Sequence, residues 1–277
     1  VDEYQTIRRA KAPSVITGKP IELGGSLGRD EATGRGAFLV LQDLAKRRGL
    51  QPSDTRVAIQ GFGNAGAQVG RLLQDAGYRV VAVSDSKGGV FAEAGLDVAA
   101  LHRAKQSSCG LDRVYCEDSV CSCCAPTSAQ QITNEELLEL DVDVLIPAAL
   151  EGVITPDNVG RIQAPIVLEV ANGPVRSEAD ARLDERGILV VPDILANAGG
   201  VVVSYFEWVQ NRHGYAWTLS EVRDRLEKTM STAFEGVWAV AQDECVSLRD
   251  ASYATALRRL QAAVVAQGTR EYFVERN

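Results

Sequence analysis

The sequence predicts an α/β fold: a Rossmann-like, doubly wound, mostly parallel sheet with C-terminal packing helices. Three observations lead to this prediction. Apolar β-branched runs without polar alternation recur between short helical segments, as in a parallel sheet that is covered on both faces. A G-x-G-x-x-G motif at residues 61–66 directly follows the first of these runs. From Ala198 onward the alternation stops and long helical periods take over.

The first half of the chain predicts a lead-in segment, a long helix and a strand–helix–strand unit. Residues 1–32 contain two prolines and the glycine-rich stretch GGSLGR, so they are expected to be irregular. Thr33 is expected to cap a helix over 34–48, where apolar side chains recur at helical spacing until Gly49. Strands and helices then alternate: strand 56–60, helix 64–76, strand 78–84, a β-like segment around Val90–Phe91 and helix 97–105.

The second half continues the alternation and then becomes helical. Thr133 opens a T-N-E-E pattern, which is typical of a capping box at the start of a short helix. Three apolar runs predict buried strands, with short helical pieces between them: 142–147, 165–170 and 187–192. Three long helical periods close the chain: 198–212, 218–244 and 250–267.

The glycine motif and its surroundings form a dinucleotide-binding fingerprint. Gly61 permits the tight strand-to-helix turn, Gly63 lets the backbone approach a pyrophosphate, and Gly66 lets the helix pack close to the strand. The helix that starts near Asn64 would direct its free N–H groups at the phosphates. Asp85 closes the next strand, where it would accept hydrogen bonds from the adenosine ribose. The alternative is a glycine-rich turn that binds nothing.

This fingerprint divides the chain into three parts. Residues 1–28 are a lead-in segment, residues 29–205 a dinucleotide-binding domain, and residues 206–277 helices that pack on it. The cofactor is NAD or NADP. An ionised Asp85 would repel a 2′-phosphate and so favours NAD by about tenfold. Ser86 and Lys87 follow directly and could serve a phosphate, so both cofactors remain open.

Small and amide side chains follow the later strands. Ala148 and Ala149 come after the strand at 142–147, Asn172 after the next strand, and Asn197 shortly after the third. Each segment alone is more typical of a turn. Because ligands of open α/β sheets bind beyond the carboxyl ends of the strands, their shared position beside the fingerprint indicates a site.

Composition excludes several classes of partner. The net charge of −8 argues against binding to nucleic acid or to an anionic membrane surface. No apolar run is long enough to span a bilayer and no leader opens the sequence, so a cytoplasmic protein is expected. Cys116, Cys121, Cys123 and Cys124 lie close together in a spacing that matches no common zinc pattern, so no metal is expected. A metal or redox role for this cluster is the alternative.

Six segments together resemble the glutamate dehydrogenases of the Glu/Leu/Phe/Val dehydrogenase superfamily. They are TGKPIELGGSLGRDEATGRG (17–36), GFGNAG (61–66), SDSKGG (84–89), IPAALEGVIT (146–155), EVANGP (169–174) and NAGGVVVSYFEWVQN (197–211). The resemblance covers almost the whole chain, and GGSLGR is closer to the glutamate enzymes than to the leucine or phenylalanine enzymes. It implies a sheet with one reversed strand. It also implies the oxidative deamination of L-glutamate to 2-oxoglutarate with NAD(P)+.

The resemblance also implies roles for individual residues. Arg29 would lie at the substrate and nicotinamide end of the cleft, and Ser204 would bind the distal carboxylate of glutamate. Thr33 would hydrogen-bond the nicotinamide carboxamide. The pyrophosphate loop would consist of Phe62, Gly63, Asn64 and Ala65. Ala148, Ala149 and Asn172 would lie near the nicotinamide ribose, and Asn197 near the nicotinamide itself. The alternatives are that Thr33 serves only as an N-cap, that Arg29 is only a solvated loop charge and that Ser204 is a polar residue on a helix face.

Two segments that the resemblance implies for catalysis are not found in these 277 residues. They are a lysine-bearing K-G-G-x-K-type segment and an aspartate in an A-P-D-type segment, which would supply the proton transfers. The chain is therefore expected to be the cofactor-binding part of the enzyme, without the N-terminal substrate domain and inactive alone. The full enzyme is expected to be a homo-oligomer. A non-catalytic dinucleotide-binding module and another amino-acid dehydrogenase of the same fold are the alternatives.

Overall fold

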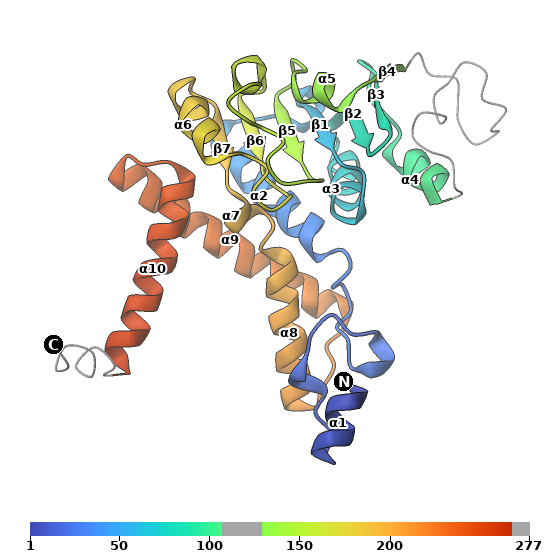
Figure 1. Cartoon of the computed structure of the whole chain (residues 1–277), viewed down its shortest axis with the longest axis vertical. Coiled ribbons are helices and arrows are strands. Elements are labelled where there is room, and N and C mark those ends of the chain that lie inside the picture. The colour runs from blue at the N-terminus through green and yellow to red at the C-terminus, as the bar shows by residue number, and fades with distance from the viewer. Residues whose placement is uncertain (107–128, 268–277) are drawn as a thin grey trace.

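The described residues form one seven-stranded sheet, which lies in the upper part of Figure 1, and several helices extend below it. The computed structural model describes residues 1–106 and 129–267. The strand order is β4-β3-β2-β1-β5-β6-β7. β3 runs antiparallel to both neighbours and the other paired strands run parallel, which confirms a mostly parallel sheet with one reversed strand. The strands are β1 (Arg56–Gln60), β2 (Arg79–Asp85), β3 (Gly88–Phe91), β4 (Gln130–Ile132), β5 (Val144–Pro147), β6 (Ile166–Leu168) and β7 (Leu189–Val191).

The helices follow the predicted order, with two differences near the N-terminus. The lead-in was expected to be irregular but contains a helix, α1. Thr33 is not the N-cap of the following helix. That helix begins at Ala32, two residues before the predicted start, and its N-cap is Glu31. The helices are α1 (Asp2–Arg8), α2 (Ala32–Arg48), α3 (Asn64–Asp75), α4 (Val98–Gln106), α5 (Asn134–Leu138), α6 (Ser177–Glu185), α7 (Asp193–Ala196), α8 (Gly199–His213), α9 (Leu219–Glu244) and α10 (Leu248–Ala266).

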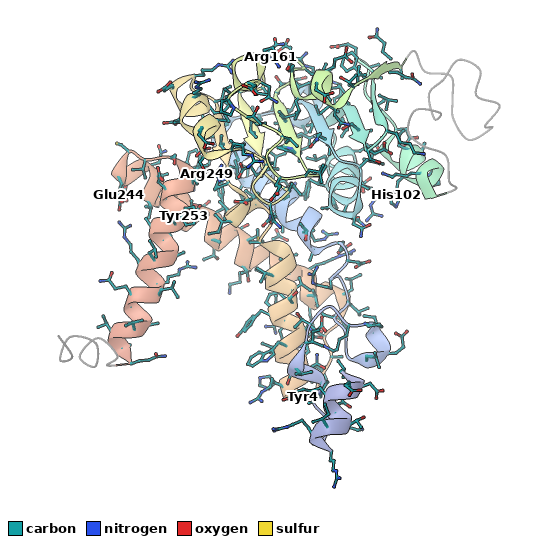
Figure 2. The ribbon with its side chains drawn as sticks, in the orientation of Figure 1. Tyr4, His102, Arg161, Glu244, Arg249 and Tyr253 are labelled. Atoms are coloured by element: carbon teal, nitrogen blue, oxygen red, sulfur yellow. The ribbon has the colours of Figure 1, made fainter. Side chains whose placement is uncertain are left out.

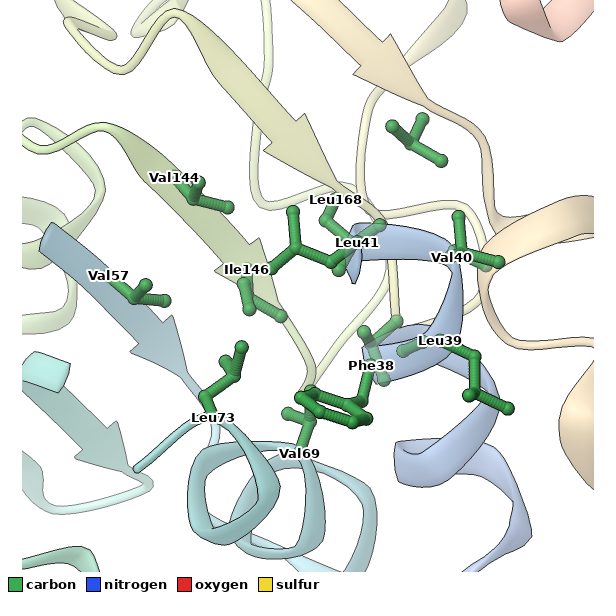
Figure 3. Packing of buried hydrophobic residues seen from close by; sticks show 14 of the residues in the cluster. Phe38, Leu39, Val40, Leu41, Val57, Val69, Leu73, Val144, Ile146 and Leu168 are labelled. Carbon is green, nitrogen blue, oxygen red and sulfur yellow. The ribbon is translucent and has the colours of Figure 1, made fainter. Parts of the chain in front are cut away.

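Two separate cores cover the two faces of the sheet, as a doubly wound fold requires. On one face, side chains of β1 and β5 such as Val57 and Ile146 pack against α2 and α3 (Figure 3). This core continues into α8 and α9, so the C-terminal helices are part of it. On the other face, alternate residues of the same strands, such as Ala58 and Leu145, pack against α5 and α6.

Glycines bring three helices of the larger core into backbone contact. A Cβ on Gly34 of α2 would lie 2.8 Å from the carbonyl oxygen of Ala65 in α3. A Cβ on Gly199 at the start of α8 would lie 2.1 Å from the carbonyl oxygen of Ala32. Real Cβ atoms do not tolerate such distances, so these positions hold glycine for close helix packing. The starts of α2, α3 and α8 are therefore held together in one place.

The lead-in segment is fastened to α8, away from the sheet (Figure 1). The carboxylate of Glu207, which is fully buried, accepts hydrogen bonds from the amides of Gly18 and Lys19 and forms an ion pair with the Lys19 ammonium. Burial alone would raise the pKa of Glu207, but these hydrogen bonds and the Lys19 charge hold it below its ordinary value. One turn further on, Asn211 donates to the carbonyl of Gly24. Both ends of residues 18–24 are thus anchored to one helix.

No helix in the described ranges is both long and apolar enough to cross a membrane. The cluster from Cys116 to Cys124 lies outside the described residues.

Candidate functional site

The sheet changes direction of winding between β1 and β5, and this is where open α/β sheets bind ligands. Gly61 follows β1 directly and has φ of +98°, which favours glycine. A Cβ on Gly61 would lie 2.5 Å from the Cβ of Ala149 and 2.7 Å from its backbone nitrogen. The glycine loop and the Ala148-Ala149 segment therefore meet at the carboxyl ends of these two strands.

The three glycines of the fingerprint have different surroundings. A Cβ on Gly66 would lie 1.9 Å from the carbonyl oxygen of Gly61, so Gly66 is required for the turn itself. Gly63 is the N-cap of α3, is exposed, and would have nothing within 4 Å of an added Cβ. Asn64, also exposed, begins the helix. The free N–H groups of this helix end consequently face open space, where an anionic group can bind.

The side chain of Phe62 does not face this space. It is buried, and its ring meets that of His102 of α4 edge-to-face, with ring centroids 6.4 Å apart. Only the backbone of Phe62 is available to a ligand. Its carbonyl oxygen already accepts a hydrogen bond of 2.8 Å from the ammonium of Lys105 in α4.

Asp85, the last residue of β2, is held from three sides. Its carboxylate accepts a hydrogen bond of 2.8 Å from the amide of Lys87 and lies 3.4 Å from the Lys105 ammonium. Its backbone carbonyl accepts from the side chain of Asn134 at 2.9 Å. Ser86 and Lys87 form the exposed turn to β3. Lys105 was not predicted from the sequence to be a site residue, because no local pattern shows that α4 reaches the end of β2.

The amide side chains that follow β6 and β7 lie together. The Asn197 side chain donates to the Asn172 side chain at 2.7 Å and, more weakly, to the carbonyl of Val170 at 3.4 Å. The segment after β5 is adjacent, because the amides of Val170 and Ala171 both donate to the carbonyl of Pro147. The structure thus brings together residues that are 25 positions apart in the sequence.

Arg29, Thr33 and Ser204 form a second polar group at the start of α2 and α8. Arg29 donates through Nε to the hydroxyl of Ser204 at 2.8 Å, and that hydroxyl donates to the carbonyl of Gly200 at 3.0 Å. The Thr33 hydroxyl also faces Gly200, since a Cβ there would lie 2.6 Å from it. A hollow beside Arg29 is lined by residues 18–21 and 26–30. This group could bind a carboxylate, because Arg29 offers further guanidinium N–H groups.

The described residues hold no group of three or more His, Cys, Asp or Glu side chains placed to bind a metal ion. The polar atoms of the site are instead donors and acceptors suited to phosphates, sugar hydroxyls, amides and carboxylates.

Comparison with known proteins finds relatives that match most of this chain. A glutamate dehydrogenase of Thermus thermophilus, crystallised as a hetero-hexamer with leucine bound, superimposes with a TM-score of 0.85 at 40% identity, over 96% of this chain and 60% of that one. The NADP-specific glutamate dehydrogenase of a Synechocystis species is 50% identical over 273 residues, which are 99% of this chain and 63% of that protein. A catabolic NAD-specific glutamate dehydrogenase of Bacillus subtilis is 43% identical over 259 residues, which are 94% of this chain and 58% of that protein.

The chain therefore spans about 60% of the length of these relatives. The Glutamate/Leucine/Phenylalanine/Valine dehydrogenase family matches residues 24–268, which include the glycine loop, the paired asparagines and the Arg29–Ser204 contact. Accordingly, the chain belongs to the Glutamate/Leucine/Phenylalanine/Valine dehydrogenase family.

Proposed function

We propose that this chain binds a nicotinamide dinucleotide across the carboxyl ends of β1 and β5. The open space at Gly63 is the main support, because no packing contact among the described residues requires a glycine there. The pyrophosphate would lie on residues 61–66 at the start of α3, and the adenosine ribose would bind Asp85. The nicotinamide ribose would lie beside Ala148, Ala149 and Asn172.

The nicotinamide would extend toward the starts of α2 and α8. Asn197 and Thr33 would hydrogen-bond it, and Arg29 and Ser204 would hold the substrate beside it. Because Ser204 is already paired with Arg29, the two would act as one unit, with the guanidinium countering a substrate carboxylate. In this arrangement the dinucleotide supplies the hydride chemistry and the protein supplies position and charge.

The whole-enzyme activity that we propose is glutamate dehydrogenation: L-glutamate, NAD(P)+ and water give 2-oxoglutarate, ammonium and NAD(P)H. The similarity to curated glutamate dehydrogenases at 50% and 43% identity supports this substrate. We further propose that these 277 residues do not oxidise glutamate by themselves, since the lysine and aspartate segments expected for proton transfer are not among them. Steady NADH production from glutamate by the purified chain would contradict this.

For the cofactor, we propose that both NAD and NADP bind, with a preference for NAD below tenfold. The Lys105 ammonium partly neutralises Asp85 and stands where it can attract a 2′-phosphate. Relatives of both specificities match this chain. The test is a pair of dissociation constants at fixed salt. Lys105→Ala should weaken NADP+ binding more than NAD+ binding, whereas Lys87→Ala, in the exposed turn, should change neither. Equal losses for both cofactors in Lys105→Ala would contradict the role of this lysine.

Calorimetric titration of the purified chain with NAD+ and NADP+ tests the proposed function as a whole. Binding of at least one with a defined stoichiometry is expected. The absence of both heat and a thermal shift at millimolar cofactor would contradict it.

A further inference from the structure

Arg249 lies in the first turn of α10, beside β7 and α7 (Figure 2). Its guanidinium contacts three carboxylates, all of them outside its own helix. Its two terminal nitrogens donate to the carboxylate of Glu169 at 3.1 and 2.8 Å. Its Nε and Nη2 donate to the carboxylate of Asp180 in α6 at 2.7 and 3.1 Å. A cation in the first turn opposes the helix dipole, so helix stability does not account for an arginine here.

Glu169 is the centre of this cluster. It directly follows β6 and is fully buried. Burial raises its pKa, and the hydrogen bonds and charge of Arg249 offset this only in part. Besides Arg249, the carboxylate accepts a hydrogen bond of 2.8 Å from the backbone amide of Asp193. It thereby joins the end of β6 to the start of α7.

Asp193 carries the connection back to the loop that follows β6. Its carboxylate accepts a hydrogen bond of 2.8 Å from the amide of Gly173 and lies 3.8 Å from Arg249 Nη1. Gly173 is the neighbour of Asn172. Asp193 begins the single turn of α7, and Asn197 is the C-cap of that helix. The two asparagine side chains then close the circuit through their 2.7 Å hydrogen bond.

We propose that Arg249 is a positioning residue for the nicotinamide half of the cofactor site, which it fixes by holding the loops that carry Asn172 and Asn197. This inference rests on the proposed function. Arg249 does not itself contact the asparagines; it acts through Glu169 and Asp193. A planar guanidinium can bind Glu169 and Asp180 in bidentate fashion at once, whereas a lysine ammonium would keep the charge without that geometry.

The adenosine half of the site has no share in this cluster. Phe62 follows β1 and Asp85 ends β2, and they form polar contacts with α4, α5 and the β2–β3 turn. Loss of the Arg249 geometry should therefore affect the two halves of a dinucleotide differently. A purely structural role, such as attachment of α10, would affect both halves alike or neither.

The test compares NADH with ADP, which keeps the adenosine and the pyrophosphate but lacks both the nicotinamide and its ribose. Dissociation constants are measured by calorimetry on the 277-residue chain and on Arg249→Lys. We expect the affinity ratio of NADH to ADP to fall about tenfold in Arg249→Lys, equivalent to about 1.4 kcal/mol. The affinity for ADP should stay within about twofold, and the change in NADH fluorescence on binding should be reduced.

Arg258→Lys is the matched control, because Arg258 lies on the same helix in an exposed ion pair with Glu244. It should leave the ratio unchanged. Asp180→Asn provides a milder second variant. It removes the charge and one acceptor oxygen of one partner of Arg249 and keeps Glu169 paired, so it should lower the ratio in the same direction. An unchanged ratio in Arg249→Lys, or a parallel loss of both ligands, would overturn the inference. Binding of neither ligand by the unsubstituted chain would instead contradict the proposed function.

Discussion

Replacement of Gly63 by valine separates ligand binding from folding, because the three glycines of the loop differ in what surrounds them. An added Cβ meets nothing within 4 Å at Gly63, but would lie 1.9 Å from a carbonyl oxygen at Gly66. The backbone of Gly63 is extended, with φ of −85°, so a β-branched residue can adopt it. The Gly63→Val protein should therefore fold normally, and the valine side chain should occupy the position proposed for the pyrophosphate.

The expected change in stability is small. Valine is a poorer N-cap than glycine, which lowers the free energy of unfolding by about 1 kcal/mol. Valine also reduces the conformational entropy of the unfolded chain, which raises the free energy of unfolding by about 0.4–1 kcal/mol. The net effect should lie within about 1 kcal/mol, or about 2–4 °C in Tm for a domain of this size. The loss of binding should be larger, at least about 100-fold or about 2.7 kcal/mol, since phosphate and side chain cannot share the space.

The assay is calorimetric titration with NAD+ and NADP+, together with thermal denaturation of each variant. Gly160→Val is the control, because Gly160, in a short 3-10 helix before β6, also has nothing within 4 Å of an added Cβ. It should bind like the unsubstituted chain. Gly66→Ala should lose stability as well as binding. If Gly63→Val binds either dinucleotide as tightly as the unsubstituted chain, the placement of the pyrophosphate is wrong.

Two further predictions concern stability. The lowered pKa of Glu207 means that the folded state binds fewer protons than the unfolded state, so this contribution to stability is present above pH 4.5 and is lost as the pH falls through the folded-state value. Glu207→Gln should lower Tm at neutral pH, by an amount that shrinks below pH 4.5; a difference independent of pH would contradict this. Thr218 caps α9 reciprocally with Glu221, so Thr218→Ala should cost about 1 kcal/mol and lower Tm by about 2–4 °C, while Thr218→Ser should not.

Elements with strong local signals could be predicted from the sequence. The bounds of β1, α3 and β2 agree with expectation to within one residue, because apolar runs, the glycine turn and helical spacing all mark the same positions. The capping box at Thr133 is present with both of its hydrogen bonds. At the other end of the scale, β4 was not predicted: its three residues include two glutamines, and only pairing with β3 makes them a strand.

Strands after β5 were predicted too long for a related reason. The apolar run at 165–170 contains a strand of only three residues, because the amides of Val170 and Ala171 turn toward the carbonyl of Pro147. Buried apolar residues thus continue past the end of the ladder. Glycine and asparagine positions at the strand ends were accessible to sequence reasoning, since each belongs to a recognisable turn pattern.

The charged residues around the site were not accessible in this way. Lys105 and Arg249 act on loops that lie far from them in the sequence, and neither belongs to a motif. Their placement depends on how α4 and α10 pack against the sheet, which only the tertiary structure determines. A sequence pattern can thus identify the surfaces that face a ligand more readily than the side chains that hold those surfaces in place.

The short outer strands have a consequence for association between copies. In the described part of the chain, the sheet ends at β4 on one side and β7 on the other, each three residues long. An edge strand offers free backbone N–H and C=O groups to any passing chain, and short edges offer few. On β4, two exposed glutamines weaken an apolar contact further. Neither edge of this sheet therefore offers a long strand with which a second copy could pair to start aggregation.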